Sequence, residues 1–185
     1  MLGAVIASPR EKTLTGLCDI CDTTCMSAAQ PATTRKVSVL FVCIGNSCRS
    51  IMAEGIAQLE AQDLLEPASA GLAPLGSIAD MTLKTLEKNG YYVRGLSSKR
   101  LTPEAWQAAD IVINMSGYPC ETAFPDCSKV EDWRIADPYG ADPDVYQKIF
   151  EEIQSRVWEL ISRLREDQGS SASEQVVPPK VGERI

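Results

Sequence analysis

The chain has 185 residues, 44% of them hydrophobic, and carries a formal net charge of −7. This length and apolar content predict one globular domain with its own core. The acidic balance argues against nucleic acid or a membrane surface as the main partner, and no apolar run is long enough to span a bilayer.

Residues 1–35 show neither helical nor strand periodicity and are rich in Thr, Ala and Ser. We expect a flexible extension here and, because no export signal is visible, a cytoplasmic protein. Cys18, Cys21 and Cys25 form a CxxC pair with a third cysteine nearby, a spacing compatible with zinc or redox chemistry. No second pair follows at zinc-ribbon spacing, so we interpret them as cysteines of a flexible tail.

The first regular elements follow directly. Val37–Val42 is apolar nearly throughout, which predicts a central parallel strand with both faces covered. A helix is predicted from Ser50 to Leu65, because apolar residues recur there at helical spacing. We expect Glu66-Pro67 to end that helix, and the short run Ala68–Gly71 to form a second parallel strand.

The alternation of helix and strand continues through the second half of the chain. Apolar spacing, capping residues and turn signals predict two helices, two strands and a turn. In chain order these are a helix over Ile78–Lys88, a short helix over Pro103–Ala109, a strand over Asp110–Met115, a weaker strand over Val130–Ile135 and a turn over Asp137–Gly140.

The last helix has the clearest pattern. Asp142 and Pro143 are typical of a helix start, and apolar residues then recur at intervals of three and four as far as Leu164. After Glu166 the sequence is polar and contains Ser and Pro, which predicts a disordered tail over 167–185. The predicted domain therefore comprises residues 36–166.

Alternating strands and helices predict an α/β fold, a three-layer sandwich with a four-stranded parallel sheet flanked by helices. In such sheets ligands bind at the carboxyl ends of the strands. Cys43 lies at such an end, as do the loops that begin at Gly71, Ser116 and Ala136. Asp137 is therefore expected to face Cys43 across one crevice.

Cysteine and histidine usage restricts the chemistry. The chain contains no histidine, which excludes Ser-His-Asp and Cys-His catalysis and histidine-ligated metals. Seven cysteines, an odd number, favour reactive or buried thiols over a disulfide framework in a chain of this length without an export signal. A nucleophile here needs another activator, and we predict neither a metal nor a cofactor.

The loop from Cys43 to Ser50 offers that activator. Successive backbone N–H groups and the positive end of the following helix form a site for an oxyanion, and Arg49 adds a bidentate fork. Gly45 lets the backbone come close to the anion, while Asn46 tolerates a left-handed conformation. The same field favours the thiolate of Cys43, to which Ser50 is placed to donate a hydrogen bond.

Phosphoryl transfer through a cysteine also needs an acid for the leaving oxygen, and later a base for water. Asp137, in a proline-stiffened turn after a strand, is the candidate for both roles. The CxxxxxR spacing with a preceding apolar strand, an embedded Gly-Asn-Ser and a following helix favours function over chance. The chain carries neither a Walker-type phosphate loop nor a Rossmann fingerprint.

VLFVCIGNSCRSIMAE closely resembles the signature of the low-molecular-weight protein tyrosine phosphatases, and equally that of their relatives, the thioredoxin-coupled arsenate reductases. The resemblance extends from Lys36 to Arg165. It implies a phosphotyrosine phosphatase I-like fold in which Cys43 is the nucleophile, Arg49 the phosphate clamp and Asp137 the general acid. It also implies that the phosphate-binding loop contains Ile44, Gly45, Asn46, Ser47, Cys48 and Ser50.

The phosphatases and the arsenate reductases differ in what happens to the anion after it is bound to the nucleophilic cysteine. A reductase resolves the arsenate adduct of its nucleophile with two further cysteines, and the position of the first resolving cysteine is occupied here by Ser116. Cys120 and Cys127 follow, displaced along the chain, and with Cys48 they are the candidate redox cysteines. It is equally consistent with the sequence that Cys120 and Cys127 have no redox role and are simply small residues of a loop.

Other positions favour one branch or the other. Tyr139 resembles the residue that phosphatases have at this position. Ser47 and the short loop after Ser116 resemble the corresponding features of reductases. Ile51 replaces a proline usual in phosphatases, and the loop 72–78 lacks the aromatic residue that many of them place beside the substrate ring.

We expect a phosphatase acting on a phosphorylated protein or a small aryl phosphate. The alternatives are an arsenate reductase that uses Cys43 with Cys120 and Cys127 and has thioredoxin as partner, and a non-catalytic oxyanion-binding module.

Overall fold

The computed structural model describes residues 35–173, with side chains as far as Gln168. The predicted N-terminal extension with Cys18, Cys21 and Cys25 lies outside the described residues, as does the end of the predicted tail. Within the described part, no helix has the length and apolar character needed to cross a membrane.

Four parallel strands form one sheet in the order β2-β1-β3-β4. The strands are β1 (Val37–Cys43), β2 (Leu65–Gly71), β3 (Ile111–Asn114) and β4 (Val130–Asp132). The helices are α1 (Arg49–Glu60), α2 (Asp80–Lys88), α3 (Pro103–Ala108), α4 (Cys120–Ala123) and α5 (Pro143–Ser173). The predicted α/β architecture with a four-stranded parallel sheet is confirmed.

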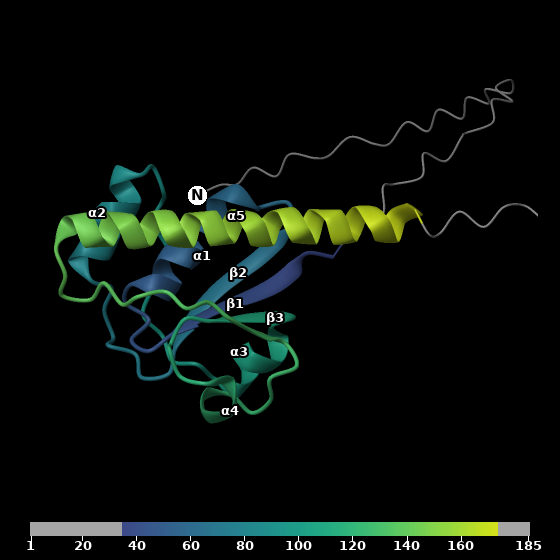
Figure 1. The fold of residues 1–185 in the computed structure, drawn as a ribbon, viewed down its shortest axis with the longest axis horizontal. Helices are drawn as coiled ribbons and strands as arrows, with labels where there is room; N and C mark the ends of the chain where they lie inside the picture. Colours follow the sequence, from purple (N-terminus) through teal and green to yellow (C-terminus); the bar gives the residue numbers. More distant parts are fainter. Residues whose placement is uncertain (1–34, 174–185) are drawn as a thin grey trace, which may run out of the picture. The chain divides into compact units, whose positions relative to one another are not determined.

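The side chains of β1 alternate between two apolar clusters, as the strand period of two requires. Val39 and Phe41 join a cluster with α1, α2 and α5, whereas Leu40 and Val42 join a second cluster with residues of α3 and α4. Figure 1 shows α1, α2 and α5 on one side of the sheet and α3 and α4 on the other, which gives three layers.

The strand order reverses between β1 and its two neighbours, because the chain passes from β1 to β2 on one side and later to β3 on the other. Ligands of open α/β sheets bind outside the carboxyl ends of the strands at such a point. The loop that follows Cys43 leaves the sheet there.

Several predicted boundaries were wrong; the strand predicted over Val130–Ile135, for example, ends at Asp132. Helix α1 ends at Glu60, and Leu65, predicted as its last residue, begins β2. Pro67 lies inside β2 and does not precede it; an edge strand tolerates proline because one row of its backbone groups is unpaired in the sheet. Helix α5 continues to Ser173, past Glu166, because no proline interrupts this stretch and helix propagation is favourable once the helix is formed.

Candidate active site

The loop after β1 turns its carbonyl groups away from the expected anion site. Four of its carbonyl oxygens accept hydrogen bonds from backbone N–H groups of the segment 72–79, at 2.9–3.2 Å. These bonds are Leu72 to Cys43, Ala73 to Ile44, Leu75 to Gly45 and Ala79 to Ser47. The N–H groups of residues 44–48 have no acceptor among the described residues, so they are free to bind an anion as a nest.

Two backbone features make this turn possible. Asn46 has a φ of 45°, in the left-handed region that asparagine tolerates better than most residues. Gly71, at the end of β2, lies against the same loop: a Cβ placed on it would come within 2.8 Å of the Ile44 carbonyl oxygen and 2.9 Å of the Asn46 Cβ. A side chain at position 71 would therefore push the loop out of its conformation.

Arg49 begins α1 and is only 4% exposed. Its Nη1 donates to the carbonyl oxygens of Met115 at 2.6 Å and Ile135 at 3.2 Å, and its Nη2 donates to Asp137. Its Nε is buried and has no partner among the described residues. A buried N–H without an acceptor is costly, so this atom is a ready donor for a bound oxyanion beside the loop N–H groups.

The Cys43 sulfur is buried at the base of this loop, 3.0 Å from the Ser50 hydroxyl oxygen. The Asn46 side-chain amide donates to that hydroxyl at 2.8 Å and to the Ser69 hydroxyl at 2.8 Å. The predicted neighbours of the cysteine, Asn46 and Ser50, are therefore brought together with it, and β2 adds a third polar residue.

Asp137 follows β4 and reaches the same site from the opposite side. Its carboxylate pairs with Arg49, and its other oxygen accepts from the Tyr139 backbone N–H at 3.2 Å. The Asp137 side chain is 46% exposed, so it can meet both water and a substrate. The expected placement of Asp137 across the crevice from Cys43 agrees with this geometry.

A cleft of about 200 Å³ opens onto these groups. Cys43, Arg49 and Asp137 line it together with loop residues, and the exposed side chains of Leu75 and Tyr139 form its walls. The cleft surface is largely apolar outside the anion site. It suits an apolar group attached to an oxyanion.

Cys48 lies in the same loop but in a different environment. Its sulfur is 3.4 Å from the Tyr146 hydroxyl, and burial raises the pKa of the Cys48 thiol. Cys43 and Cys48 are both free thiols. Because Cys48 is buried, its neutral thiol is favoured over the thiolate.

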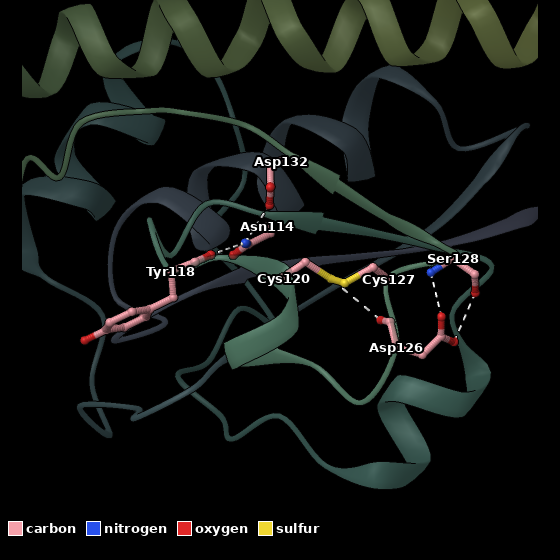
Figure 2. The surroundings of a disulfide bond; sticks show 7 residues. All are labelled: Asn114, Tyr118, Cys120, Asp126, Cys127, Ser128 and Asp132. Atoms are coloured by element: carbon pink, nitrogen blue, oxygen red, sulfur yellow. Dashed lines mark hydrogen bonds between the residues drawn. A yellow bond between two sulfur atoms is a disulfide. The ribbon is translucent and has the colours of Figure 1, made fainter.

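The loop after β3 holds the other candidate redox residues. Cys120 and Cys127 form a disulfide (Figure 2). We expected reactive or buried thiols and named these two cysteines as a redox pair only for the reductase alternative. Ser116, at the position where a reductase has its first resolving cysteine, donates from its hydroxyl to the Asn114 side-chain oxygen at 2.7 Å and accepts from the Tyr118 N–H. Its role in the described structure is to hold the turn.

Several residues at or near the site were not predicted. Leu75 forms a wall through a loop whose conformation the sequence does not reveal, and Tyr146 reaches Cys48 from a distant helix. Glu54 is the exception that a pattern could have revealed, because it lies one helical turn after Ser50 on a buried face of α1. In the described part of the chain, no group of three or more acidic or cysteine side chains is placed to hold a metal ion.

Comparisons with known proteins agree with this geometry. The family model "Low molecular weight phosphotyrosine protein phosphatase" matches residues 38–170. Arsenate reductase 1 of Staphylococcus epidermidis is 30% identical over 136 residues, which cover 70% of this chain and 99% of that protein.

Two solved structures are similar over the same region. The YwlE arginine phosphatase of Geobacillus stearothermophilus superimposes with a TM-score of 0.64 at 28% identity, covering 72% of this chain and 96% of that one. A low molecular weight protein tyrosine phosphatase from T. tengcongensis gives a TM-score of 0.63 at 30% identity, covering 69% and 99%. The relatives are thus enzymes of two kinds, phosphatases and arsenate reductases.

Proposed function

The chain belongs to the low molecular weight phosphotyrosine protein phosphatase family, and we propose that it is a phosphatase that hydrolyses phosphomonoesters through a cysteinyl-phosphate intermediate on Cys43. The observation that carries this proposal is the convergence of three groups on one cleft. These are the Cys43 sulfur, the unpartnered donors of the loop and Arg49, and the Asp137 carboxyl group.

In the first step, the phosphoryl oxygens of the substrate bind the loop N–H groups and the Arg49 guanidinium, and the Asp137 carboxylate leaves Arg49 and takes up a proton from the solvent. The Cys43 thiolate attacks phosphorus, forming the S–P bond as the bond from phosphorus to the ester oxygen breaks. Asp137, in its acid form, gives its proton to that leaving oxygen. The product alcohol or phenol leaves, and phosphate remains on Cys43.

In the second step, water attacks the phosphoryl group of Cys43. The Asp137 carboxylate, left unprotonated by the first step, takes a proton from this water. The S–P bond breaks, inorganic phosphate departs, and Cys43 returns to the thiolate that the Ser50 hydroxyl faces at 3.0 Å. The same carboxyl group thus serves as acid and then as base.

The shape of the cleft supports an aryl group on the substrate. Its volume of about 200 Å³ accommodates a single ring, and Tyr139 and Leu75 provide an aromatic and an aliphatic wall. We therefore propose a phosphotyrosine side chain of a protein, or a small aryl phosphate, as the substrate, and the cytoplasm as the location.

Arsenate reduction is the second candidate, and two observations favour it. The similarity to arsenate reductase 1 covers nearly the whole of that protein, and Cys120 and Cys127 lie close enough to bond. In this alternative arsenate forms an adduct with Cys43. Two electrons then come from a pair of thiols that become a disulfide, releasing arsenite, and thioredoxin reduces the disulfide again.

One experiment separates the candidates. The purified chain is given an aryl phosphate and, separately, arsenate with thioredoxin and its reductant. We expect aryl phosphate turnover that is lost in Cys43→Ser, and turnover that survives this substitution would refute the mechanism. Arsenate turnover that needs Cys120 or Cys127 would instead identify a reductase, and failure of both assays would leave a non-catalytic oxyanion-binding module.

A further inference from the structure

A second cavity adjoins the cleft of the candidate active site. It is an open cavity of about 480 Å³ between the start of α2 and the segment that leads into α5, two elements that lie side by side in Figure 1. Ser47, Leu75 and Tyr139 line both cavities, so the exposed side chains of Leu75 and Tyr139 stand where the two cavities meet. The proposed catalytic steps use no residue that lines only the second cavity.

A small substrate has no use for this second cavity. One aryl ring, attached to a phosphate that the loop binds, occupies the first cavity of about 200 Å³ and stays there. A phosphotyrosine within a peptide continues on both sides of the ring, and its neighbouring residues must pass over Leu75 and Tyr139. Large exposed apolar side chains that gather at the entrance of a site are typical of a surface that binds a partner.

The lining of the second cavity combines apolar surface with a single charge. Ala79 and Met81 are half-buried, Tyr146 is buried, and Asp80 is exposed. Asp80 is the one charged side chain among the described residues that line this cavity. Within residues 35–168, its carboxylate takes part in no hydrogen bond and no ion pair. It is therefore free to pair with a cation that a ligand supplies.

A basic side chain matches this lining. The aliphatic stem of an arginine or lysine packs on apolar surface while its charged head stays in a polar environment. Here Met81 and the ring of Tyr139 supply the surface, and Asp80 supplies the opposite charge. The face of the Tyr139 ring also attracts a cation. An acidic side chain would meet the uncompensated negative charge of Asp80.

The spacing along a peptide follows from extended geometry. Side chains two positions apart in an extended chain point to the same face, roughly 6–7 Å from one another, whereas adjacent side chains point to opposite faces. The two cavities adjoin, because they share three lining residues. With a phosphotyrosine side chain in the first cavity, the residue two positions away therefore faces the second.

We propose that the second cavity is a subsite for an arginine or lysine two positions before or after the phosphotyrosine of a peptide, and that Asp80 selects its positive charge. The inference rests on the proposed function and deepens it, because it names a phosphotyrosine flanked by a basic residue as the substrate. Asp80 also lies in the first turn of α2, where a negative charge stabilises a helix. A role confined to the helix would change unfolding and leave the choice of peptide unchanged.

The test measures peptide binding and needs no turnover. Full-length Cys43→Ser, which cannot form the cysteinyl-phosphate, is titrated into fluorescent phosphotyrosine peptides of equal length with arginine, glutamine or glutamate two positions before or after the phosphotyrosine. We expect the arginine peptide to bind about fivefold more tightly than the glutamine peptide in one of these two registers. Adding Asp80→Asn should reduce this preference below about twofold, and adding Asp80→Lys should make the glutamate peptide the better ligand.

Glu104→Gln is the matched control. Glu104 lies in the first turn of α3, on the other side of the sheet, so this substitution also removes one negative charge from the start of a helix (Figure 1). It should keep the fivefold preference. A peptide with arginine directly beside the phosphotyrosine controls for the net charge of −7, which attracts any basic peptide. Its advantage over glutamine should stay below about twofold, because that side chain points away from the cavity.

The outcomes separate this subsite from a structural role of Asp80 and from the proposed function. Equal binding of the arginine and glutamine peptides would overturn the proposal, as would an equal preference for arginine beside the phosphotyrosine. A preference that survives Asp80→Asn while the unfolding temperature falls would assign Asp80 to the helix alone. Aryl phosphate turnover by the unmodified chain without a peptide preference would refute only the subsite. A preference for the arginine peptide without any turnover would refute only the proposed function.

Discussion

Two loops of this protein occupy equivalent places in the sheet, and each contains two cysteines. The loop after β1 holds Cys43 and Cys48 as free thiols, whereas the loop after β3 leads into Cys120 and Cys127, joined as a disulfide. Both loops leave the carboxyl end of a parallel strand. Position in the fold and possession of cysteines therefore do not make an active site by themselves.

The difference lies in where the backbone N–H groups point. After β3 several of them are used within the loop: those of Ser116 and Tyr118 bind neighbouring side chains, and that of Phe124 binds the Cys120 carbonyl. After β1, the carbonyl groups are occupied by a neighbouring segment and the N–H groups are left free. Since a buried arginine also follows only the first loop, only that loop offers an oxyanion a full set of donors.

Substitution of the buried arginine should have the largest effect on catalysis, because only the loop after β1 is followed by such an arginine. Arg49→Lys keeps the positive charge but loses the fork that holds two backbone carbonyls and leaves Nε for the anion. We expect kcat/KM for an aryl phosphate to fall about a thousandfold. Arg163→Lys, an exposed arginine paired with Glu131, is the control and should change nothing. A loss below tenfold in Arg49→Lys would show that the loop N–H groups suffice.

Loss of the general acid, Asp137, should lower the rate less than loss of Arg49, by a factor that depends on the leaving group of the substrate. Asp137→Asn preserves the bond from the Tyr139 N–H but cannot protonate the leaving oxygen. We expect kcat to fall about a hundredfold for a poor leaving group and less for a good one. Asp126→Asn is the matched control, because Asp126 also accepts from a backbone N–H two residues later, that of Ser128, but in the loop after β3. An equal loss for all leaving groups would argue against Asp137 as the acid.

The two cysteines of the first loop should differ from one another. Burial raises the pKa of Cys48, so its thiol form persists to higher pH and the reactive thiolate is scarce at neutral pH. We expect alkylation of Cys48 at about pH 7 to be at least tenfold slower than that of Cys43. Mass spectrometry of the two sites checks this, and equal rates would contradict the distinction drawn between them.

The second loop should have the smallest effect on catalysis. Cys127→Ser opens the disulfide and should cost about 2 kcal/mol of stability under non-reducing conditions. Aryl phosphate turnover should stay within about twofold, since no residue of that disulfide lines the cleft. Thermal unfolding and steady-state rates measure the two effects. A large loss of turnover would mean that the two loops are coupled.

The sequence predicted those parts of the molecule that depend on local pattern. The apolar run before Cys43, the glycine and asparagine after it and the helix at Arg49 identified the anion loop, and the alternation of elements identified the sheet. Contacts between residues far apart in the chain could not be predicted from the sequence. Nothing local indicates that the Lys99 backbone fixes the Asn46 amide, or that Leu75 closes a wall of the cleft.

The boundary errors have local causes. Leu64 and Leu65 continue the apolar character of the helix α1, yet Leu65 pairs with Val37 at the start of β2. The sequence offered the pairing of Cys120 with Cys127 only as part of the reductase alternative. An odd number of cysteines says nothing about which two are brought together by a turn.

Trapping the covalent intermediate shows whether Cys43 carries the phosphoryl group. The protein is mixed with an aryl phosphate, quenched in acid within the first turnovers, digested and analysed by mass spectrometry. We expect one phosphoryl group on the peptide that contains Cys43, assigned by fragmentation to that residue and absent in Cys43→Ser. Phosphate on another residue, or turnover without any covalent phosphate in the presence of an intact Cys43, would contradict it.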